Sequence, residues 1–179
     1  MKIGIIGNGF VGNATLQLKC QNIEVLAYDL NPNLCIPPNM KFTDLLDCRI
    51  VFISVPTPMN KNGSCYLGII QSVLKDLQNI NFNNFIVLRS TVPVGTSDKL
   101  NCFFMPEFLT EKNYINDFIN NKEWIFGLLE NNTKHELFKQ TLTELFTIAH
   151  SHKKIKNNIL QFVTNKEAEM IKMFRNCYL

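Results

Sequence analysis

Short apolar runs alternate along the chain with stretches whose apolar residues recur every three or four positions. The runs have the length of buried strands, and they predict strands at residues 2–6, 23–29, 49–55, 85–88, 102–105, 123–129 and 159–164. The stretches between them predict helices at residues 11–20, 66–80 and 133–148. Because strands that alternate with helices form βαβ units, we expect an α/β fold with a doubly wound, mostly parallel sheet and helices on both faces.

Two of these helices carry local signals of their ends and buried sides. In the second helix, one side holds the apolar residues Ile69, Ile70, Val73, Leu74 and Leu77. In the third, Thr133 and Glu136 have the spacing of a capping box. The candidate core residues of the third helix are Leu137, Leu142 and Leu145.

A last helix is predicted from residue 166 to the end of the sequence. Asn165 can cap it, and Glu167 and Glu169 in its first turn suit the positive end of the helix dipole. Its buried side is expected to hold Ala168, Ile171 and Phe174. We therefore divide the chain into one domain at residues 1–164 and the start of a central connecting helix at residues 165–179.

Composition and charge limit the classes of function. The 179 residues are 46% hydrophobic and 11% aromatic, which is enough for the core of one domain. The net charge of +3 comes without a dominant basic block and gives little support to nucleic acid as a partner. No apolar run reaches the roughly 20 residues that cross a bilayer, and the N-terminus lacks the pattern of a signal peptide. We expect a cytoplasmic protein that does not insert into membranes.

The cysteines and histidines do not form a metal-binding pattern. The six cysteines are scattered singly, without a C-x-x-C pair, and are interpreted as reduced thiols. His150 and His152 form an H-x-H pair, but no nearby cysteine or carboxylate cluster completes a site. The sequence therefore predicts no metal centre.

A glycine-rich loop lies directly between the first predicted strand and the first predicted helix. Its sequence, GNGFVG, places Gly7 at a tight turn, Gly9 where a backbone can approach a pyrophosphate, and Gly12 where helix and strand pack closely. The amides near Phe10 and Val11 would face the phosphates at the start of the helix. This context predicts a Rossmann-like dinucleotide site.

Asp29 ends the second predicted strand, 22 residues after Gly7. A carboxylate at this place accepts hydrogen bonds from both ribose hydroxyls of adenosine and repels a 2′-phosphate, which favours NAD over NADP. The alternative interpretation is a structural glycine turn beside a surface aspartate.

Three further loops follow strands, at the sheet edge where α/β proteins bind their ligands. They are SVPTP at residues 54–58, STVPVG at 90–95 and MPEFLTE at 105–111. Their prolines stiffen the backbone, and Thr57 and Thr91 supply hydroxyls. If residues from Leu109 onward are helical, Glu107 and Glu111 lie on one side, where one can hold a ligand and the other can handle a proton. Paired acids are also common on surfaces.

Lys172 and Asn176 are four residues apart on the last predicted helix. This spacing puts an ammonium and an amide on one face, where both can point at a developing oxyanion. The alternative is a solvated side of the helix.

Taken together, GNGFVG, Asp29, FISVPTPMNKNGS, RSTVPVGTSDKL, MPEFLTEKNYINDF and EAEMIKMFRN resemble, in this order, the N-terminal half of the UDP-glucose/GDP-mannose dehydrogenase family. The segment PEF-x-x-E is the most specific element. The resemblance implies an enzyme that oxidises the C6 alcohol of a UDP-sugar, UDP-glucose or a related nucleotide sugar, to a carboxylate with two NAD, through a thioester on a cysteine.

The resemblance also implies roles for individual residues. The glycine loop and Asp29 would bind NAD, together with the backbone of Val55 and Pro56, and Thr57, Ser90 and Thr91 would lie beside the cofactor or the reacting sugar. Glu111 would bridge cofactor and substrate, and Phe108 and Leu109 would contact the substrate. Glu107 would be the general acid/base for the hydrolytic water, Lys172 and Asn176 would stabilise the oxyanion, and Thr91 would also belong to the catalytic residues.

The resemblance covers the first part of such an enzyme. In the family the nucleophilic cysteine and the second, sugar-nucleotide-binding domain follow the Lys and Asn positions, so we expect this chain alone not to turn over. The family dimerises through the central helix, so we expect a homodimer in the complete enzyme and partly unburied Ile171, Phe174 and Tyr178. Only six residues separate Gly95 from Cys102, too few for the family's long helix, so we expect exposed apolar surface there.

Two other readings of the sequence stay open. One is a module that binds NAD without turnover, as a sensor, a scaffold or half of a split enzyme. The other is a relative of the β-hydroxyacid dehydrogenases, which also combine a glycine loop with a Lys-x-x-x-Asn helix, although PEF-x-x-E and STVP speak against it.

Overall fold

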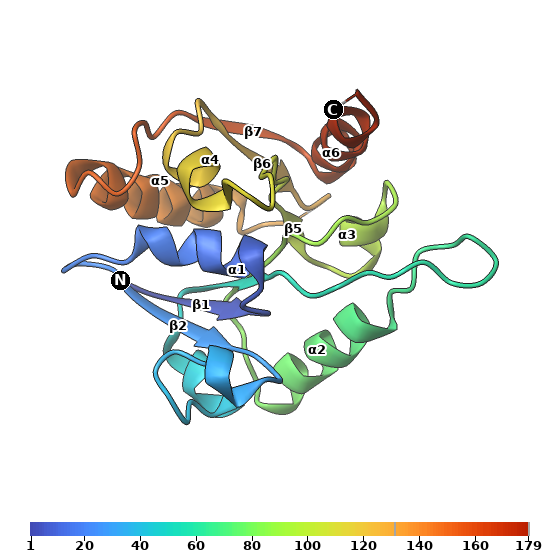
Figure 1. Cartoon of the computed structure of the whole chain (residues 1–179), viewed down its shortest axis with the longest axis horizontal. Coiled ribbons are helices and arrows are strands. Elements are labelled where there is room, and N and C mark those ends of the chain that lie inside the picture. Colours follow the sequence, from blue (N-terminus) through green and yellow to red (C-terminus); the bar gives the residue numbers. More distant parts are fainter. Residues whose placement is uncertain (131, 179) are drawn as a thin grey trace.

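The computed structural model describes residues 1–130 and 132–178, and of Tyr178 only the backbone. Seven strands form one sheet in the order β2-β1-β3-β4-β5-β6-β7 (Figure 1). Their bounds are β1 Lys2–Ile6, β2 Glu24–Tyr28, β3 Ile50–Ile53, β4 Phe85–Leu88, β5 Phe103–Phe104, β6 Trp124–Leu128 and β7 Leu160–Thr164. All neighbouring pairs are parallel except β5 and β6. The predicted fold class is confirmed.

Helices cover both faces of this sheet. The α-helices are α1 Phe10–Thr15, α2 Gly68–Asn79, α3 Thr96–Lys99, α4 Tyr114–Ile119, α5 His135–Ser151 and α6 Asn165–Tyr178. Short 3₁₀ helices are η1 Leu16–Leu18, η2 Pro32–Leu34 and η3 Phe42–Asp47. One core packs α1, α4 and α5 against one face, and a second core packs α2 and α6 against the other.

The strands are apolar at nearly every position because both of their faces are buried. In β3, Ile50 and Phe52 belong to the first core, whereas Val51 and Ile53 belong to the second. All four side chains are 0% exposed. This pattern is typical of a parallel sheet between two layers of helices. It explains why the strands read as continuous apolar runs rather than as alternating positions.

The first two predicted helices are shorter in the structure. The predicted helix at residues 11–20 is α1 up to Thr15 and then continues as η1. The predicted helix at residues 66–80 is α2, in which Ile70 and Leu77 are fully buried and the other three predicted apolar positions are half-buried.

The predicted capping box of α5 is wrong. The N-cap is Lys134, without a side-chain cap, and Glu136 pairs with Lys139 over 2.8 Å. Leu142 and Leu145 are fully buried as predicted, but Leu137 is 52% exposed.

The start of α6 also differs from the prediction. Thr164 and Glu167 form the capping box: the Thr164 N–H donates to Glu167 Oε2 over 2.8 Å, and the Glu167 N–H donates to Thr164 Oγ1 over 3.2 Å. The Thr164 N–H and the Thr164 hydroxyl, which both donate to Glu167 Oε2, lower the pKa of Glu167. The Asn165 side chain instead donates over 2.9 Å to Asp98 Oδ1 and to the Cys102 carbonyl. Asn165 is therefore not the cap, because its amide joins α6 to the sheet.

The buried side of α6 holds fewer of the predicted residues than expected. Ala168 is fully buried and Ile171 is half-buried, but Phe174 is 59% exposed. Phe174 and Ile171 are thus partly unburied, as expected for the end of this helix, and the side chain of Tyr178 lies outside the described residues.

The expected exposed apolar surface after Gly95 is absent from the described residues around it. The connection holds the short helix α3, and α6 packs on α3, β5, β6 and β7. Cys102, Phe103 and Phe104 are at most 4% exposed. The helix from the end of the chain therefore covers the sheet where the short connection cannot.

Within residues 1–130 and 132–178, no helix is long and apolar enough to cross a membrane. The same residues contain no group of three His, Cys, Asp or Glu side chains that are placed to hold a metal ion.

The cysteine thiols differ sharply in their expected reactivity. Burial raises the pKa of the Cys48 and Cys102 thiols to about 12, whereas Cys177 is exposed. Because the thiolate is the reactive form, we expect Ellman's reagent at pH 8 to label Cys177 in the native protein and to spare Cys48 and Cys102 until the chain unfolds. Mass spectrometry of labelled peptides measures this, with a Cys177→Ser variant as control. Rapid native labelling of Cys48 or Cys102 would contradict the packing described here.

Candidate functional site

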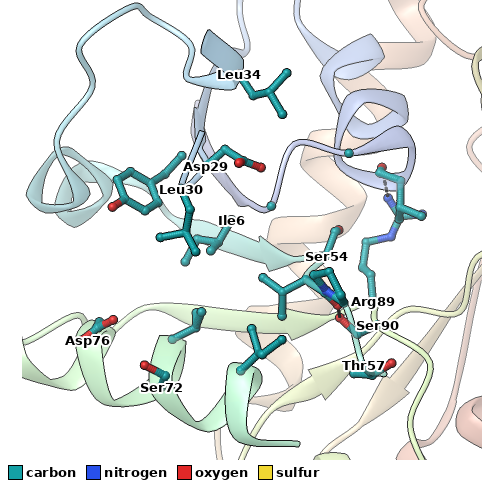
Figure 2. A pocket seen from close by; sticks show the side chains of 18 of the residues that line it. Ile6, Asp29, Leu30, Leu34, Ser54, Thr57, Ser72, Asp76, Arg89 and Ser90 are labelled. Atoms are coloured by element: carbon teal, nitrogen blue, oxygen red, sulfur yellow. Dashed lines mark hydrogen bonds between the residues drawn. The ribbon is translucent and has the colours of Figure 1, made fainter. Parts of the chain in front are cut away.

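A cleft of about 1030 Å³ lies at the carboxyl edge of the sheet (Figure 2). It is bordered by the ends of β1 to β4 and by α2. Since β2 and β3 flank β1 on opposite sides, this edge is the switch point of the sheet, where crossovers leave in opposite directions and open a crevice. In Figure 2, Asp29 and Leu34 lie at one end of the cleft, and Arg89, Ser90 and Thr57 lie at the other.

The three glycines of GNGFVG differ in why a glycine occupies the position. Gly7 has φ +88°, and a Cβ there would lie 2.6 Å from the Ser54 carbonyl oxygen. A Cβ on Gly12 would lie 2.0 Å from the Gly7 carbonyl oxygen. A Cβ on Gly9 would have nothing within 4 Å. Gly7 and Gly12 are thus required by the fold itself, whereas the space at Gly9 is open and available to a ligand.

Asp29 follows β2, and its carboxylate is held by the backbone. Oδ2 accepts from the Asn8 N–H and Oδ1 accepts from the Asn31 N–H, each over 2.8 Å. An ionised carboxylate has about four acceptor positions, so each oxygen keeps one for a further donor. Asp29 is half-buried and lines the cleft. A carboxylate with one acceptor position left on each oxygen fits the paired hydroxyls of a ribose.

The start of α1 offers hydrogen-bond donors to the same cleft. Its N-cap is Gly9, and no side chain caps the first turn. Phe10 and Val11 line the cleft. The first-turn N–H groups of a helix have no partners within the helix, so they suit phosphate oxygens. Together with the open space at Gly9 and the free acceptors of Asp29, this arrangement fits a dinucleotide.

The loops after β3 and β4 are joined at the other end of the cleft. Ser90 Oγ donates to the Val55 carbonyl over 2.6 Å, and Thr57 Oγ1 donates to the Thr91 carbonyl over 2.7 Å. These four residues and Pro56 all line the cleft. The two loops therefore form one continuous wall. The Ser90 and Thr57 hydroxyls donate to backbone carbonyls in this wall and not into the cleft.

Arg89, at the end of β4, is a residue of this site that the sequence reasoning left without a role. It is 2% exposed, lines the cleft, and donates to Thr15 Oγ1 and, over 3.4 Å, to the Val11 carbonyl. Burial lowers the pKa of Arg89 to about 10, and the charge of Glu107 opposes this shift. The guanidinium stays charged at neutral pH. Its signal in the sequence was a lone charge at the end of the apolar run FIVL.

Glu107 and Lys172 form a buried ion pair beside the cleft. Lys172 Nζ lies 2.5 Å from Glu107 Oε1 and 2.6 Å from the Glu107 carbonyl oxygen. The two side chains are 10% and 5% exposed. The second carboxylate oxygen accepts from the Leu109 N–H over 2.9 Å. The structure thus brings together two predicted site residues that are 65 positions apart.

A second contact joins α6 to the loop after β5. The Arg175 guanidinium carbon lies 4.0 Å from the centre of the Phe108 ring. Phe108 and Leu109 line a small cavity of about 20 Å³ that Arg89 and Glu107 also border. The cavity is too small for a sugar, so these two residues lie behind the cleft rather than in it.

Two of the predicted site residues, Glu111 and Asn176, do not line the cleft. Residues 107–110 are not helical, and α4 begins only at Tyr114, so Glu107 and Glu111 do not share a helix face as expected. Glu111 is exposed and does not line the cleft. Asn176 is also exposed, one turn beyond the buried Lys172.

Residues 38–150 match the sequence model described as UDP-glucose/GDP-mannose dehydrogenase family, NAD binding domain. The matched range includes the loops after β3, β4 and β5 and begins after the glycine loop and Asp29.

Several known proteins are similar to the chain. UDP-glucose 6-dehydrogenase of Campylobacter jejuni is 27% identical over 215 residues, which cover 100% of this chain and 52% of that protein. UDP-glucose 6-dehydrogenase TuaD of Bacillus subtilis is 30% identical over 145 residues, 73% of this chain and 29% of that protein. The chain thus spans about half the length of the first of these relatives.

Solved structures share the fold. GDP-mannose dehydrogenase of Pseudomonas aeruginosa superposes with a TM-score of 0.80 at 23% identity, over 99% of this chain and 50% of that one. UDP-glucose dehydrogenase of Pyrobaculum islandicum gives the same TM-score at 18% identity, over 99% and 49%.

Proposed function

Because the chain belongs to the UDP-glucose/GDP-mannose dehydrogenase family and carries its NAD-binding domain, we propose that it is the cofactor-binding part of a UDP-glucose 6-dehydrogenase. The observation that carries this proposal is the placement of the buried Glu107–Lys172 pair beside a cleft that fits a dinucleotide. The proposed reaction converts the C6 alcohol of the sugar to a carboxylate. It removes four electrons as two hydrides and adds one oxygen from water.

When bound, NAD supplies the hydride acceptor, and two molecules are reduced for each sugar oxidised. The chain's own residues bind and orient it. The proposed contacts are the first-turn amides of Phe10 and Val11 with the pyrophosphate and Asp29 with the adenosine ribose. The wall of Thr57, Ser90 and Thr91 then orients the reactive end of the cofactor toward Glu107.

In this proposal Lys172 and Glu107 handle charge and protons. The Lys172 ammonium stabilises the negative charge that develops on the C6 oxygen. The Glu107 carboxylate takes a proton from the water that attacks the acyl carbon of the cysteine thioester. The C–S bond then breaks, and the proton goes to the departing thiolate of the nucleophilic cysteine that the family carries after the Lys and Asn positions. The close ion pair holds the ammonium and the carboxylate together beside the cleft. The roles of Phe108, Leu109, Glu111 and Asn176 as substrate contacts rest on the family motif alone.

The proposed partner of α6 is a second copy of the chain. Its outer side exposes Met170, Met173 and Phe174 by 52%, 40% and 59%. An exposed apolar stripe of this kind favours self-association. Sedimentation of the chain at high concentration tests this, and a monomer at all concentrations would exclude the homodimer for this chain.

Asp29 is expected to decide which cofactor binds. Replacing Asp29 by Asn keeps an acceptor for one of the two backbone amides, of Asn8 and Asn31, and removes the charge and the acceptor of the other. We expect NAD affinity to fall about tenfold, with the discrimination against NADP lost, because the charge that repels the 2′-phosphate is gone. Calorimetric titration with both cofactors measures this. An unchanged preference for NAD would remove Asp29 from the ribose site.

The reaction itself is tested by NADH absorbance in the protein that carries this domain, with UDP-glucose, GDP-mannose and an N-acetylated UDP-sugar as alternative substrates. The proposal predicts two NADH per UDP-glucose and the uronate as product. One NADH per sugar, or oxidation of a different nucleotide sugar only, would contradict it. NAD binding without oxidation of any of them would favour a module that binds NAD without turnover.

A further inference from the structure

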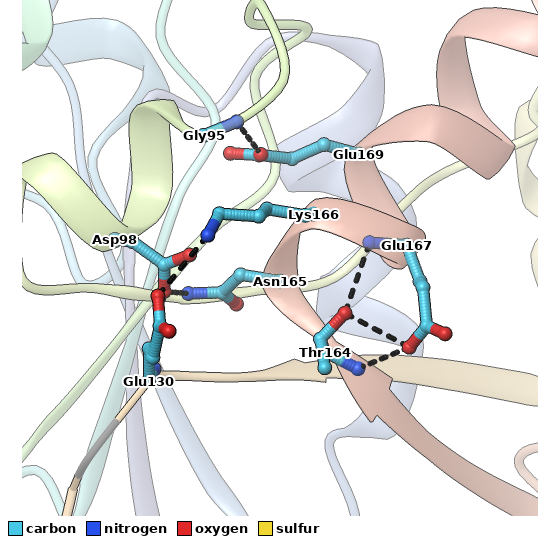
Figure 3. Close-up of polar contacts among 8 residues, drawn as sticks. All are labelled: Gly95, Asp98, Glu130, Thr164, Asn165, Lys166, Glu167 and Glu169. Atoms are coloured by element: carbon cyan, nitrogen blue, oxygen red, sulfur yellow. Dashed lines mark hydrogen bonds and ion pairs between the residues drawn. The ribbon is translucent and has the colours of Figure 1, made fainter.

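Glu169 on α6 is a buried carboxylate that the proposed chemistry does not use. It is 0% exposed. Its Oε2 accepts from the Gly95 N–H over 2.5 Å, and its Oε1 accepts from the Ser97 N–H over 2.7 Å. Figure 3 shows the side chain reaching from α6 to the loop that follows β4. Each carboxylate oxygen thus binds one backbone amide at the start of α3, whose N-cap is Gly95.

This arrangement is specific for a carboxylate. Among residues 1–130 and 132–178, no lysine, arginine or histidine forms an ion pair with Glu169 within 4.0 Å. A buried charge without a counter-ion is costly unless hydrogen bonds satisfy it. Two amide donors, one on each oxygen, supply those bonds, and charge-assisted hydrogen bonds are among the strongest in proteins. Glu169 was expected to face the positive end of the dipole of its own helix, but its carboxylate instead holds another segment.

The position of Glu169 links the two parts of the site. Lys172 follows it by three residues on the same helix, so both lie on the side that faces the sheet. The segment that Glu169 holds, residues 95–97, is the continuation of the loop that carries Ser90 and Thr91 at the cleft. A shift of α6 relative to this loop would therefore move the Lys172 ammonium relative to the cofactor wall.

The other polar contacts of α6 lie elsewhere on the helix. Asn165 binds Asp98 and the Cys102 carbonyl at the start of the helix. Lys166 pairs with Glu130, but both side chains are more than half exposed, and such pairs contribute little. The turn that carries Lys172 is held by Glu169 on one side and by the ion pair with Glu107 on the other, and Arg175 contacts the Phe108 ring about one turn later.

We propose that Glu169 is a positioning residue: its carboxylate fixes α6 on the loop after β4 and thereby holds Lys172 Nζ against Glu107. The effect of Glu169 on the position of Lys172 does not depend on which reaction the protein catalyses. The expected effect of Glu169 on turnover rests on the proposed function.

The test measures the reactivity of Lys172 in the whole chain, without cofactor or substrate. Lys172 is 4% exposed, so brief acetylation followed by peptide mass spectrometry should label it slowly. In Glu169→Gln, one oxygen becomes an amide nitrogen that faces an N–H donor, so one bond is lost and a repulsion is added. We expect Lys172 to be acetylated roughly tenfold faster or more. Lys166, which is exposed, serves as the reference within each sample.

The matched control is Glu167→Gln, on the same helix two residues earlier. It removes the capping carboxylate but not a contact with residues 95–97. We expect Lys172 to stay protected in this variant even if it lowers the unfolding temperature as much as Glu169→Gln does. Acetylation of Lys172 at the same slow rate in wild type and Glu169→Gln would overturn the proposal. Equally fast acetylation in Glu169→Gln and Glu167→Gln would also overturn it.

A second measurement needs no variant. In the wild-type chain, the Gly95 and Ser97 amides should exchange hydrogen at least a hundredfold more slowly than the amides of the exposed loop at residues 61–64. Exchange at the rate of that loop would show that Glu169 does not hold them and would overturn the proposal. Since neither measurement involves turnover, failure of the oxidation assay leaves this result unaffected.

Discussion

Replacement of Gly12 by alanine is expected to destabilise the protein by about 3 kcal/mol or more and to abolish NAD binding. The added Cβ would lie 2.0 Å from the Gly7 carbonyl oxygen and 3.0 Å from the Gly7 carbonyl carbon. Both are backbone atoms, so no side-chain rotation relieves the overlap. Helix α1 must move away from the turn after β1, and the first-turn amides move with it. Urea denaturation and NAD titration measure the two effects.

The matched variant is Gly9→Ala in the same loop. A Cβ on Gly9 meets nothing within 4 Å, and its φ of −69° suits alanine. We expect stability to be unchanged or raised by about 0.4 to 1 kcal/mol, because alanine restricts the unfolded chain. The NAD affinity should nevertheless fall roughly tenfold or more, since the methyl group occupies the space into which the pyrophosphate fits.

The contrast between the two variants separates fold from ligand. A Gly12→Ala protein that is as stable as wild type would refute the packing of α1 on the loop. A Gly9→Ala protein that binds NAD normally would show that the cofactor does not approach the loop at this residue.

Breaking the Glu107–Lys172 pair is expected to have the second large effect. Both partners are almost fully buried, so Lys172→Met leaves a buried carboxylate without its cation, and Glu107→Gln leaves a buried cation without its carboxylate. We expect each variant to lose about 3–5 kcal/mol of stability. The double variant should lose less than the sum of the two by about 1–3 kcal/mol, because it removes both charges together.

An exposed ion pair in the same protein provides the control for this cycle. Arg49 and Glu144 lie 2.9 Å apart, but their side chains are 47% and 49% exposed. Their coupling should be about 1 kcal/mol or less. Denaturant unfolding of all variants gives both cycles. A coupling between Glu107 and Lys172 as small as that of the exposed pair would show that the two side chains do not form a buried pair in solution.

The sheet and the glycine loop were predictable from the sequence for a local reason. The strands are buried on both faces, so each is a short apolar run that stands out without any knowledge of the partner strand. Gly12 is fixed by a contact with Gly7 within the strand–turn–helix unit, and Gly7 is required locally by its φ of +88°, although a Cβ there would also meet Ser54 after β3. The same local signals placed Asp29 at the end of β2.

Helix ends were less predictable because several local signals compete. The Thr133–Glu136 and Thr164–Glu167 spacings are equivalent as motifs, yet only the second forms a capping box. Asn165 was a reasonable cap by residue type, but its amide is used by Asp98 and the Cys102 carbonyl, which are more than 60 positions away. Tertiary contacts of this kind decide which of two adjacent residues caps a helix.

The polar residues of the site were predictable only where a motif names them. Glu107 and Lys172 were singled out separately, and the sequence alone carries no sign that they touch each other. Arg89 and Glu169 were missed as site residues because each works through backbone atoms or a hydroxyl of a distant segment. For Arg89 the available signal was a charge directly after the apolar run FIVL, whereas Glu169 lies in the polar sequence NKEAE and gave no such signal.

The packing of α6 on the sheet beside α3 could not be predicted from local sequence, because the two segments are far apart in the chain. The connection between β4 and β5 is too short for a long helix, which led to the expectation of exposed apolar surface. Helix α6 packs there instead, about 70 residues later in the chain. The same packing brings Lys172 to Glu107, so the element that completes the second core also completes the candidate site.

The most direct test of the central claim is a calorimetric titration of the chain with NAD, repeated with NADP. We expect saturable binding of one NAD per chain in the cleft between Gly9 and Asp29, and no measurable binding of NADP at the same concentrations. Absence of any heat with NAD, from protein whose circular dichroism shows the α/β fold intact, would contradict the assignment of this cleft as the cofactor site.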